Sequence, residues 1–185
     1  VAHNAVDASE FAKCENARSR LRAKLGINDD VVLAGYLGSY AFYHDAIRLV
    51  LAASIIAKQR CEFQVKILMV GSGKEYLECR ALAEELGLLG ETLLMLPVIP
   101  KNQVPDVLSA LDIAVLPGST DIICPIKVQE YMACQLPTIT PDYPCNREVL
   151  RDGVTGEFFA PKNAEALAAK IMLLAKDDAV RLRMG

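Results

Sequence analysis

Nearly uninterrupted apolar runs, each followed by a glycine turn and a helical pattern, constrain the fold of this chain more than any other feature. Residues 31–37 read VVLAGYL and residues 65–70 read VKILMV. A strand that exposes one face to water alternates apolar and polar residues, whereas a strand covered on both faces is apolar throughout. The two runs therefore predict interior strands of a parallel sheet that helices cover on both sides.

The same strand–helix order repeats along the chain. Further strands are predicted at 91–96, 112–117, 138–140 and 157–161, and helices at 15–25, 45–58, 75–86, 102–111, 125–134, 164–175 and from 177 onward. Repeated strand–helix units give parallel strands joined by right-handed crossovers. We therefore predict an α/β fold, a doubly wound, Rossmann-like parallel sheet, in which residues 1–185 form a single domain.

Composition excludes several other classes of protein. Hydrophobic residues make up 52% and charged residues 23% of the 185, which is typical of a globular chain, and the net charge of −3 argues against a nucleic-acid partner. No apolar run reaches the ~18 residues of a membrane span. The six cysteines form no C-x-x-C pair, so we expect reduced thiols in a cytosolic protein, with no metal site and no cofactor.

The most informative stretch begins at Pro125. Proline suits the first turn of a helix, and Lys127 and Glu130 are three residues apart, so they project from the same side. N–H groups of a first helical turn are free and partly positive, and with Lys127 they would bind an anion, while Glu130 would accept hydrogen bonds from sugar hydroxyls. In a doubly wound sheet the loops at 38–44, 71–73, 98–100 and 117–126 gather beyond the carboxyl ends of the strands.

Two linked motifs resemble a known family. Residues 125–140 read PIKVQEYMACQLPTIT and residues 148–156 read EVLRDGVTG. They are similar to the donor-binding signature P-x-K-x-x-E-Y-M-A-x-x-x-P and to E-V-x-x-D-G-x-T-G of family 4 glycosyltransferases, the large retaining group with the GT-B fold. The resemblance implies the C-terminal half of such an enzyme, which binds the nucleotide-sugar donor.

The family's phosphate-binding loop reads G-R-x-x-x-x-K-G, where Arg and Lys hold the diphosphate. Here Gly38 is present, Ser39 replaces the Arg and His44 replaces the Lys. Histidine carries charge only part of the time at neutral pH. The alternative for His44 is a polar residue at a helix start in contact with solvent. Both sequence differences predict weaker phosphate binding than the family's usual residues would give.

The remaining site residues also follow from the resemblance. Gly71 lies in a G-x-G-x-E turn, which either approaches the ligand or only makes the bend, and the backbone of the loop with Val98 and Ile99 would read the base. The family signature E-x7-E places its first acid at Ile122, so Asp121 is the nearest carboxylate that can substitute. The predicted substrate-binding set is Gly38, Ser39, His44, Gly71, Val98, Ile99, Asp121, Pro125, Ile126, Lys127 and Glu130.

Three further expectations concern residues outside that set. The arginines and lysines of 15–25 are expected to form a solvated face. Asp112 stands at a strand entrance, where an acid usually caps or pairs rather than catalyses. Cys124 lies beside the predicted anion site and is expected to be a spectator.

The resemblance also predicts partners. Residues 1–11 resemble the inter-domain linker of GT-B enzymes, so we expect an acceptor-binding N-terminal domain, absent from this chain, as partner. The expected function is glycosyl transfer from a nucleotide-sugar to a glycan, lipid or polysaccharide acceptor, in the cytoplasm or at the inner membrane face, with peripheral membrane association through the missing half. The isolated domain is expected to be inactive. The alternative is a non-catalytic module that binds a partner or glycan; a receiver-like domain is disfavoured because no acid cluster is present.

Overall fold

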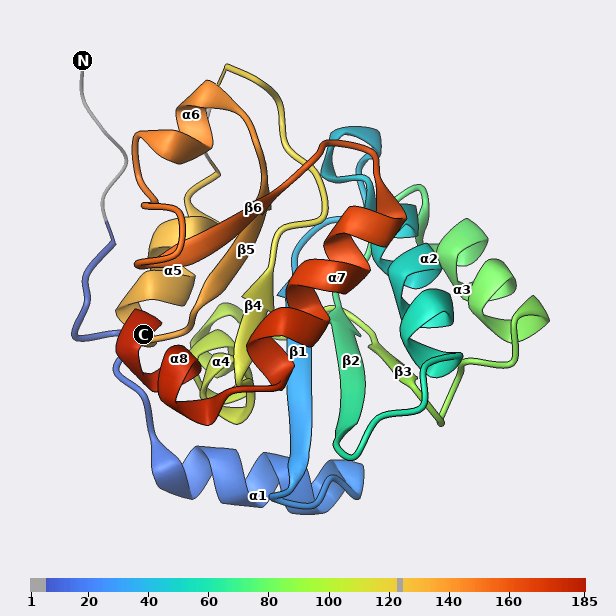
Figure 1. The fold of residues 1–185 in the computed structure, drawn as a ribbon. Coiled ribbons are helices and arrows are strands. Elements are labelled where there is room, and N and C mark those ends of the chain that lie inside the picture. The colour runs from blue at the N-terminus through green and yellow to red at the C-terminus, as the bar shows by residue number, and fades with distance from the viewer. Residues whose placement is uncertain (1–5, 123–124) are drawn as a thin grey trace.

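The computed structural model describes residues 6–122 and 125–185, which form one parallel sheet between two layers of helices (Figure 1). The strands are β1 (Val31–Leu37), β2 (Gln64–Val70), β3 (Leu93–Leu96), β4 (Ile113–Val115), β5 (Thr138–Pro141) and β6 (Gly156–Phe159). Their order across the sheet is β3-β2-β1-β4-β5-β6, and all neighbouring strands are parallel. The predicted fold class, an α/β doubly wound sheet, is confirmed.

The helices lie close to their predicted positions. They are α1 (Glu15–Leu25), α2 (Ala46–Ala57), α3 (Tyr76–Glu85), α4 (Val104–Ala110), α5 (Lys127–Ala133), α6 (Pro144–Arg147), α7 (Ala164–Ala175) and α8 (Asp178–Met184). The short α6, with a proline in its first turn, was not predicted. The helix expected from 102 begins instead as a 3-10 turn, η2 (Lys101–Gln103).

The apolar runs are explained by two separate cores, one on each face of the sheet. In β1, Ala34 and Tyr36 pack into the core under α2, α3 and α7. Leu33 and Leu37 point the opposite way, into the core under α4 and α5. Successive strand side chains alternate between faces, so β1, which is covered on both faces, is apolar on both.

The strand order reverses between β1 and β4. After β1 the chain proceeds through β2 to β3 on one side, and from β4 it proceeds through β5 to β6 on the other (Figure 1). The loops that leave the carboxyl ends of β1 and β4 therefore diverge, which opens a crevice where ligands bind in folds of this kind.

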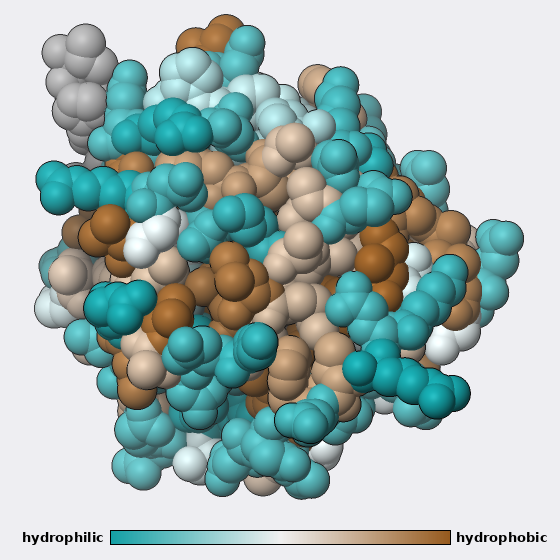
Figure 2. All heavy atoms as spheres, viewed as in Figure 1, coloured by the Kyte–Doolittle hydropathy of each residue, from teal (hydrophilic) through white to brown (hydrophobic). Residues whose placement is uncertain are grey.

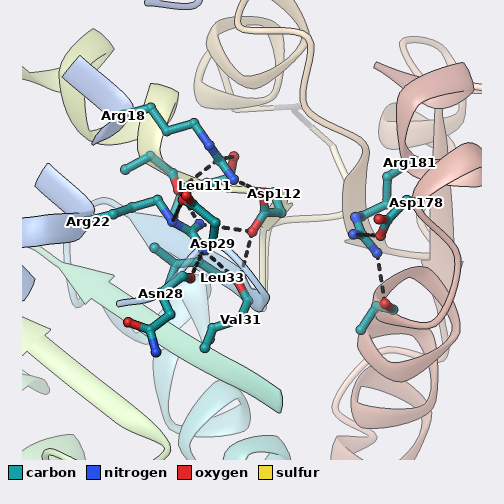
Figure 3. A network of polar contacts seen from close by, with 12 residues as sticks. Arg18, Arg22, Asn28, Asp29, Val31, Leu33, Leu111, Asp112, Asp178 and Arg181 are labelled. Carbon is teal, nitrogen blue, oxygen red and sulfur yellow. Dashed lines mark hydrogen bonds and ion pairs between the residues drawn. The ribbon is translucent and has the colours of Figure 1, made fainter. Parts of the chain in front are cut away.

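A network of charged groups joins α1 to the opposite, amino-terminal edge of the sheet (Figure 3). Arg22 is 1% exposed, and its guanidinium donates to Asp112 at 3.1 Å and to the carbonyls of Asn28 and Val31. Arg18 donates to the other oxygen of Asp112 at 2.7 Å. The expectation of a solvated face on α1 is therefore wrong for these arginines, because α1 packs along α4 and turns them inward. The structural role expected of Asp112 is confirmed.

The surface on the side of α7 carries a band of apolar side chains where that helix lies, bordered by hydrophilic ones (Figure 2). Leu173 of α7, 52% exposed, is part of this surface. Within residues 6–122 and 125–185, no helix has both the length and the apolar character needed to cross a membrane.

The Arg22–Asp112 pair gives a test of the fold. Asp112→Ala is expected to lower the free energy of unfolding by about 3 kcal/mol, because it removes the carboxylate hydrogen-bonded to the buried guanidinium and leaves only the exposed Asp29, 3.9 Å away. The matched control is Asp106→Ala, which removes the partner of Arg20 in a pair whose side chains are 68% and 46% exposed. That change should cost less than about 1 kcal/mol. Equal losses in urea titrations of the two variants would contradict a structural role of the network.

Candidate functional site

A pocket of about 340 Å³ lies at the carboxyl edge of the sheet, beside the reversal between β1 and β4. It is bounded by the loops after β1, β2 and β3 and by the start of α5. Eight predicted site residues line it: Gly38, Ser39, Gly71, Val98, Ile99, Ile126, Lys127 and Glu130. The loops expected at 38–44, 71–73 and 98–100 meet here, whereas of the loop 117–126 only Ile126 lines this pocket.

Three predicted residues lie outside the lining. His44 sits behind Lys127, with its Nε2 3.1 Å from the Lys127 Nζ. Pro125 precedes α5, and its carbonyl accepts the N–H of Val128. Asp121 lines a neighbouring hollow of about 600 Å³ with the aromatic rings of Phe42, Tyr43 and Tyr143, so the loop carries this carboxylate away from the pocket. Cys124 lies outside the described residues.

Lys127 reaches the pocket because Gly38 has no side chain. A Cβ on Gly38 would lie 2.5 Å from the Lys127 Nζ and 2.7 Å from the Tyr36 hydroxyl, closer than real contacts allow. The ammonium lies 5.1 Å from the centre of the Tyr36 ring, within the range of a cation–π contact. A side chain at position 38 would therefore displace the Lys127 ammonium or the Tyr36 hydroxyl from its observed place.

Gly71 is required by the bend. Its φ is +148°, and a Cβ there would come within 1.9 Å of the Gly38 carbonyl oxygen. The loop after β2 therefore packs directly on the loop after β1, and Tyr40 N–H donates to the Ser72 carbonyl at 2.9 Å. Of the two roles considered for Gly71, the bend accounts for the glycine, although the residue also lines the pocket.

The expectation of free N–H groups at the start of α5 is wrong for three residues. The N–H groups of Val128, Gln129 and Glu130 already donate to the carbonyls of Pro125 and Ile126. The first turn is closed by these bonds, so an anion in the pocket would depend mainly on the Lys127 ammonium.

Burial shifts both charged groups of α5. Burial lowers the pKa of Lys127 from 10.5 to about 8, against the opposing effect of Glu130. Burial raises the pKa of Glu130, which Lys127 and Lys101 oppose. Each group is thus held where its charged form is disfavoured, which is common at functional sites.

His44 is buried rather than in contact with solvent, so the alternative considered for it is wrong. It ends the 3-10 turn η1 (Phe42–His44), is 6% exposed, and its Nδ1 lies 2.8 Å from the Ser39 carbonyl oxygen. Burial first, and the positive charge of Lys127 second, lower the pKa of His44.

Sequence reasoning missed Tyr36 as part of this site. Its hydroxyl donates to the Ser39 carbonyl at 2.7 Å, and its ring lies under Lys127. The available signal was a tyrosine in an otherwise aliphatic buried strand, since a buried tyrosine hydroxyl needs a hydrogen-bond partner. Among the residues that the structure describes, no three His, Cys, Asp or Glu side chains group as a metal site would require.

A larger hollow of about 670 Å³ lies at the amino-terminal edge. Its lining includes two ion pairs, Arg18 with Asp112 and Arg181 with Asp178 (Figure 3). Volume alone therefore does not mark the functional site of this fold, and the smaller pocket at the strand reversal is the better candidate.

A family model described as "Glycosyl transferases group 1" matches residues 17–185. The chain belongs to this family. The match spans both the pocket and the sheet that carries it. No curated protein sequence matches the chain.

Several solved structures share the fold. HepE (Alr3699) of Anabaena in complex with UDP has a TM-score of 0.85 at 20% identity, covering 98% of this chain and 49% of its own. Sucrose-phosphate synthase of Thermosynechococcus elongatus has a TM-score of 0.81 at 24% identity, covering 97% and 44%. The C-terminal domain of the group 1 glycosyltransferase LpcC of Francisella tularensis has a TM-score of 0.80 at 20% identity, covering 97% and 92%.

The fold of this group 1 chain is thus that of the C-terminal domain of GT-B glycosyltransferases. The chain spans about half the length of HepE and of the synthase, and nearly all of the separate LpcC domain.

The pKa of Lys127 makes a prediction about stability. Because the pKa of the folded state, about 8, is below the ordinary 10.5, the unfolded chain binds the proton more tightly, and stability should rise with pH between these values. Lys127→Met should therefore raise the melting temperature of the unliganded domain at neutral pH, and the gain should vanish above pH 10.5. Lys74→Met, at an exposed lysine, is the control. A loss of stability on Lys127→Met at neutral pH would contradict the assignment.

Proposed function

We propose that this chain is the nucleotide-sugar-binding domain of a retaining, family 4 glycosyltransferase. The observation that carries the proposal is the pocket at the strand reversal, which combines apolar walls with one cation. Val98 and Ile126 are 65% and 44% exposed at its border, where they offer contact area for a nucleobase or sugar ring. Lys127 provides the charge that a diphosphate requires.

Glu130 gives the pocket a second polar function. It lies one turn along α5 from Lys127, on the same side, and lines the pocket with it. A carboxylate accepts hydrogen bonds from adjacent hydroxyls, so Glu130 is the group proposed to hold the donor ribose. Its raised pKa stays compatible with this role as long as Lys127 and Lys101 favour the ionised form.

UDP is the first nucleotide to test, because the HepE structure contains it. We propose that no metal ion and no cofactor is required, and that Lys127 stabilises the leaving diphosphate as negative charge develops. Transfer needs a second domain that positions the acceptor against the donor, and we propose an N-terminal acceptor-binding domain as that partner. The 185 residues alone should bind the donor weakly and transfer no sugar; the complete enzyme is proposed to act in the cytoplasm or at the inner membrane face.

One observation favours a second candidate, a non-catalytic module that binds a partner or a glycan. The loop after β1 carries Ser39 and His44 where the family usually has two cations. Loss of donor binding with retention of the fold would fit such a module.

A ligand panel tests the proposal. UDP, GDP, ADP and their sugars should be titrated into the wild type and into Lys127→Ala and Glu130→Ala, with calorimetry and thermal shift as readouts. One nucleotide is expected to bind, and each substitution should weaken it about tenfold or more, because each removes hydrogen bonds to or from a charged group. Lys74→Ala, which removes a nearby exposed cation, should have little effect.

The outcomes separate the two candidates. Equal weakening by Lys74→Ala and Lys127→Ala would indicate general attraction of anions rather than a site. A flat panel for this chain and for the full-length protein would favour the non-catalytic module. Clear sugar transfer by these 185 residues alone would refute the expected need for a second domain.

A further inference from the structure

We infer that His44 positions the Lys127 ammonium by accepting a hydrogen bond from it, instead of serving as a second cation for the diphosphate. The inference rests on the proposed function, because it gives one residue of the same site a role. It starts from the contact between Lys127 Nζ and His44 Nε2 at 3.1 Å. An ammonium group is only a donor, so this contact is favourable only if Nε2 carries a lone pair.

The other ring nitrogen supports the same tautomer. His44 Nδ1 lies 2.8 Å from the carbonyl oxygen of Ser39 and 3.0 Å from the Ser39 hydroxyl. A carbonyl oxygen only accepts, so Nδ1 must carry the proton. With its proton on Nδ1 and its lone pair on Nε2, the neutral ring satisfies both neighbours at once. In the opposite tautomer, the lone pair of Nδ1 would point at the Ser39 carbonyl oxygen and the N–H of Nε2 would point at the Lys127 ammonium. Both contacts would then be repulsive.

The surrounding groups fix the ring and the lysine in these places. Tyr36 donates to the same Ser39 carbonyl at 2.7 Å, which holds that acceptor in position. The Lys127 ammonium lies over the Tyr36 ring, and it has room there because Gly38 has no side chain. His44 is buried, and its backbone packs against Gly118, where a Cβ would lie 2.7 Å from the His44 carbonyl carbon.

The charged and titratable groups around the ring agree with a neutral histidine. Lys127 faces it from α5 and Tyr36 from β1, while the Tyr43 ring lies 4.4 Å away. The next residue, Asp45, is paired with Arg48 at 3.2 Å. Of these groups, the one in contact with Nε2 is the Lys127 ammonium, and its positive charge opposes protonation of the ring. A neutral acceptor leaves the other ammonium protons of Lys127 available to a ligand.

Nitrogen NMR tests the tautomer directly and needs no ligand. The chain contains two histidines, so His44→Gln assigns the His44 signals by their disappearance. At neutral pH the expected spectrum shows a protonated Nδ1 and an unprotonated Nε2. Lys127→Ala should raise the pKa of His44, because it removes the adjacent positive charge; Lys74→Ala should not. A protonated Nε2, or a His44 that becomes doubly protonated when UDP-glucose is added, would overturn the inference.

A double-mutant cycle with UDP-glucose tests the positioning role. This ligand has no phosphate group that titrates near neutral pH, so its affinity reports the protein. His44→Ala should weaken binding about tenfold, whereas His44→Gln, which keeps an acceptor, should stay within about threefold. In a Lys127→Ala background, His44→Ala should change the affinity by less than about twofold, because the histidine acts only through the lysine.

The outcomes distinguish this inference from the proposed function. Equal effects of His44→Ala with and without Lys127 would show an independent contact and overturn the positioning role. A wild type that binds neither UDP-glucose nor any other nucleotide or nucleotide-sugar of the panel would refute the function proposed for the pocket and the diphosphate part of this inference together. The wrong tautomer, with UDP-glucose binding intact, would refute only the inference.

Discussion

Because helices cover both faces of the sheet, the two clusters of charged side chains described above lie at its edges. At the amino-terminal edge, Arg22 is surrounded by Asp112 and by backbone carbonyls, so its charge is used within the fold. At the carboxyl edge, Lys127 contacts the neutral rings of His44 and Tyr36. A cation already paired with a carboxylate stabilises a structure, whereas a cation held by neutral groups keeps its charge for a ligand. The two edges therefore have different roles although both carry buried cations.

Much of this arrangement could be predicted from the sequence because it follows from local rules. Continuous apolar runs give strands covered on both faces, and the carboxyl ends of parallel strands meet at one edge. Lys127 and Glu130 are three residues apart on one helix, so their spacing alone predicts that both side chains project from the same side. Gly38 directly follows a strand, which indicated a loop that could come close to a ligand. Its close approach to Lys127, 89 residues further along the chain, was not predicted.

The rest depends on contacts between distant segments. The burial of His44 depends on a contact with Lys127, 83 residues further along the chain, and no local pattern in the sequence marks that contact. Arg18 and Arg22 are four residues apart on one face of α1, so a shared partner was conceivable, but only the packing of α1 along α4 brings Asp112 to them. Asp121 left the predicted site because its loop follows the neighbouring hollow instead.

The desolvation of Lys127 would explain, in the proposed function, how one cation could serve where the family usually has more. Desolvation lowers the pKa of Lys127 to about 8, which is still above neutral pH, so the protonated form predominates. Its nitrogen partner within residues 6–122 and 125–185 is the His44 ring. In a site of low effective dielectric constant, the attraction between opposite charges is several-fold stronger than in water. A diphosphate entering the pocket would supply negative charge that offsets the cost of desolvating the lysine. A well-positioned buried lysine thus gains more from each ligand charge than a solvated arginine would, provided that a neutral neighbour such as His44 keeps it in place.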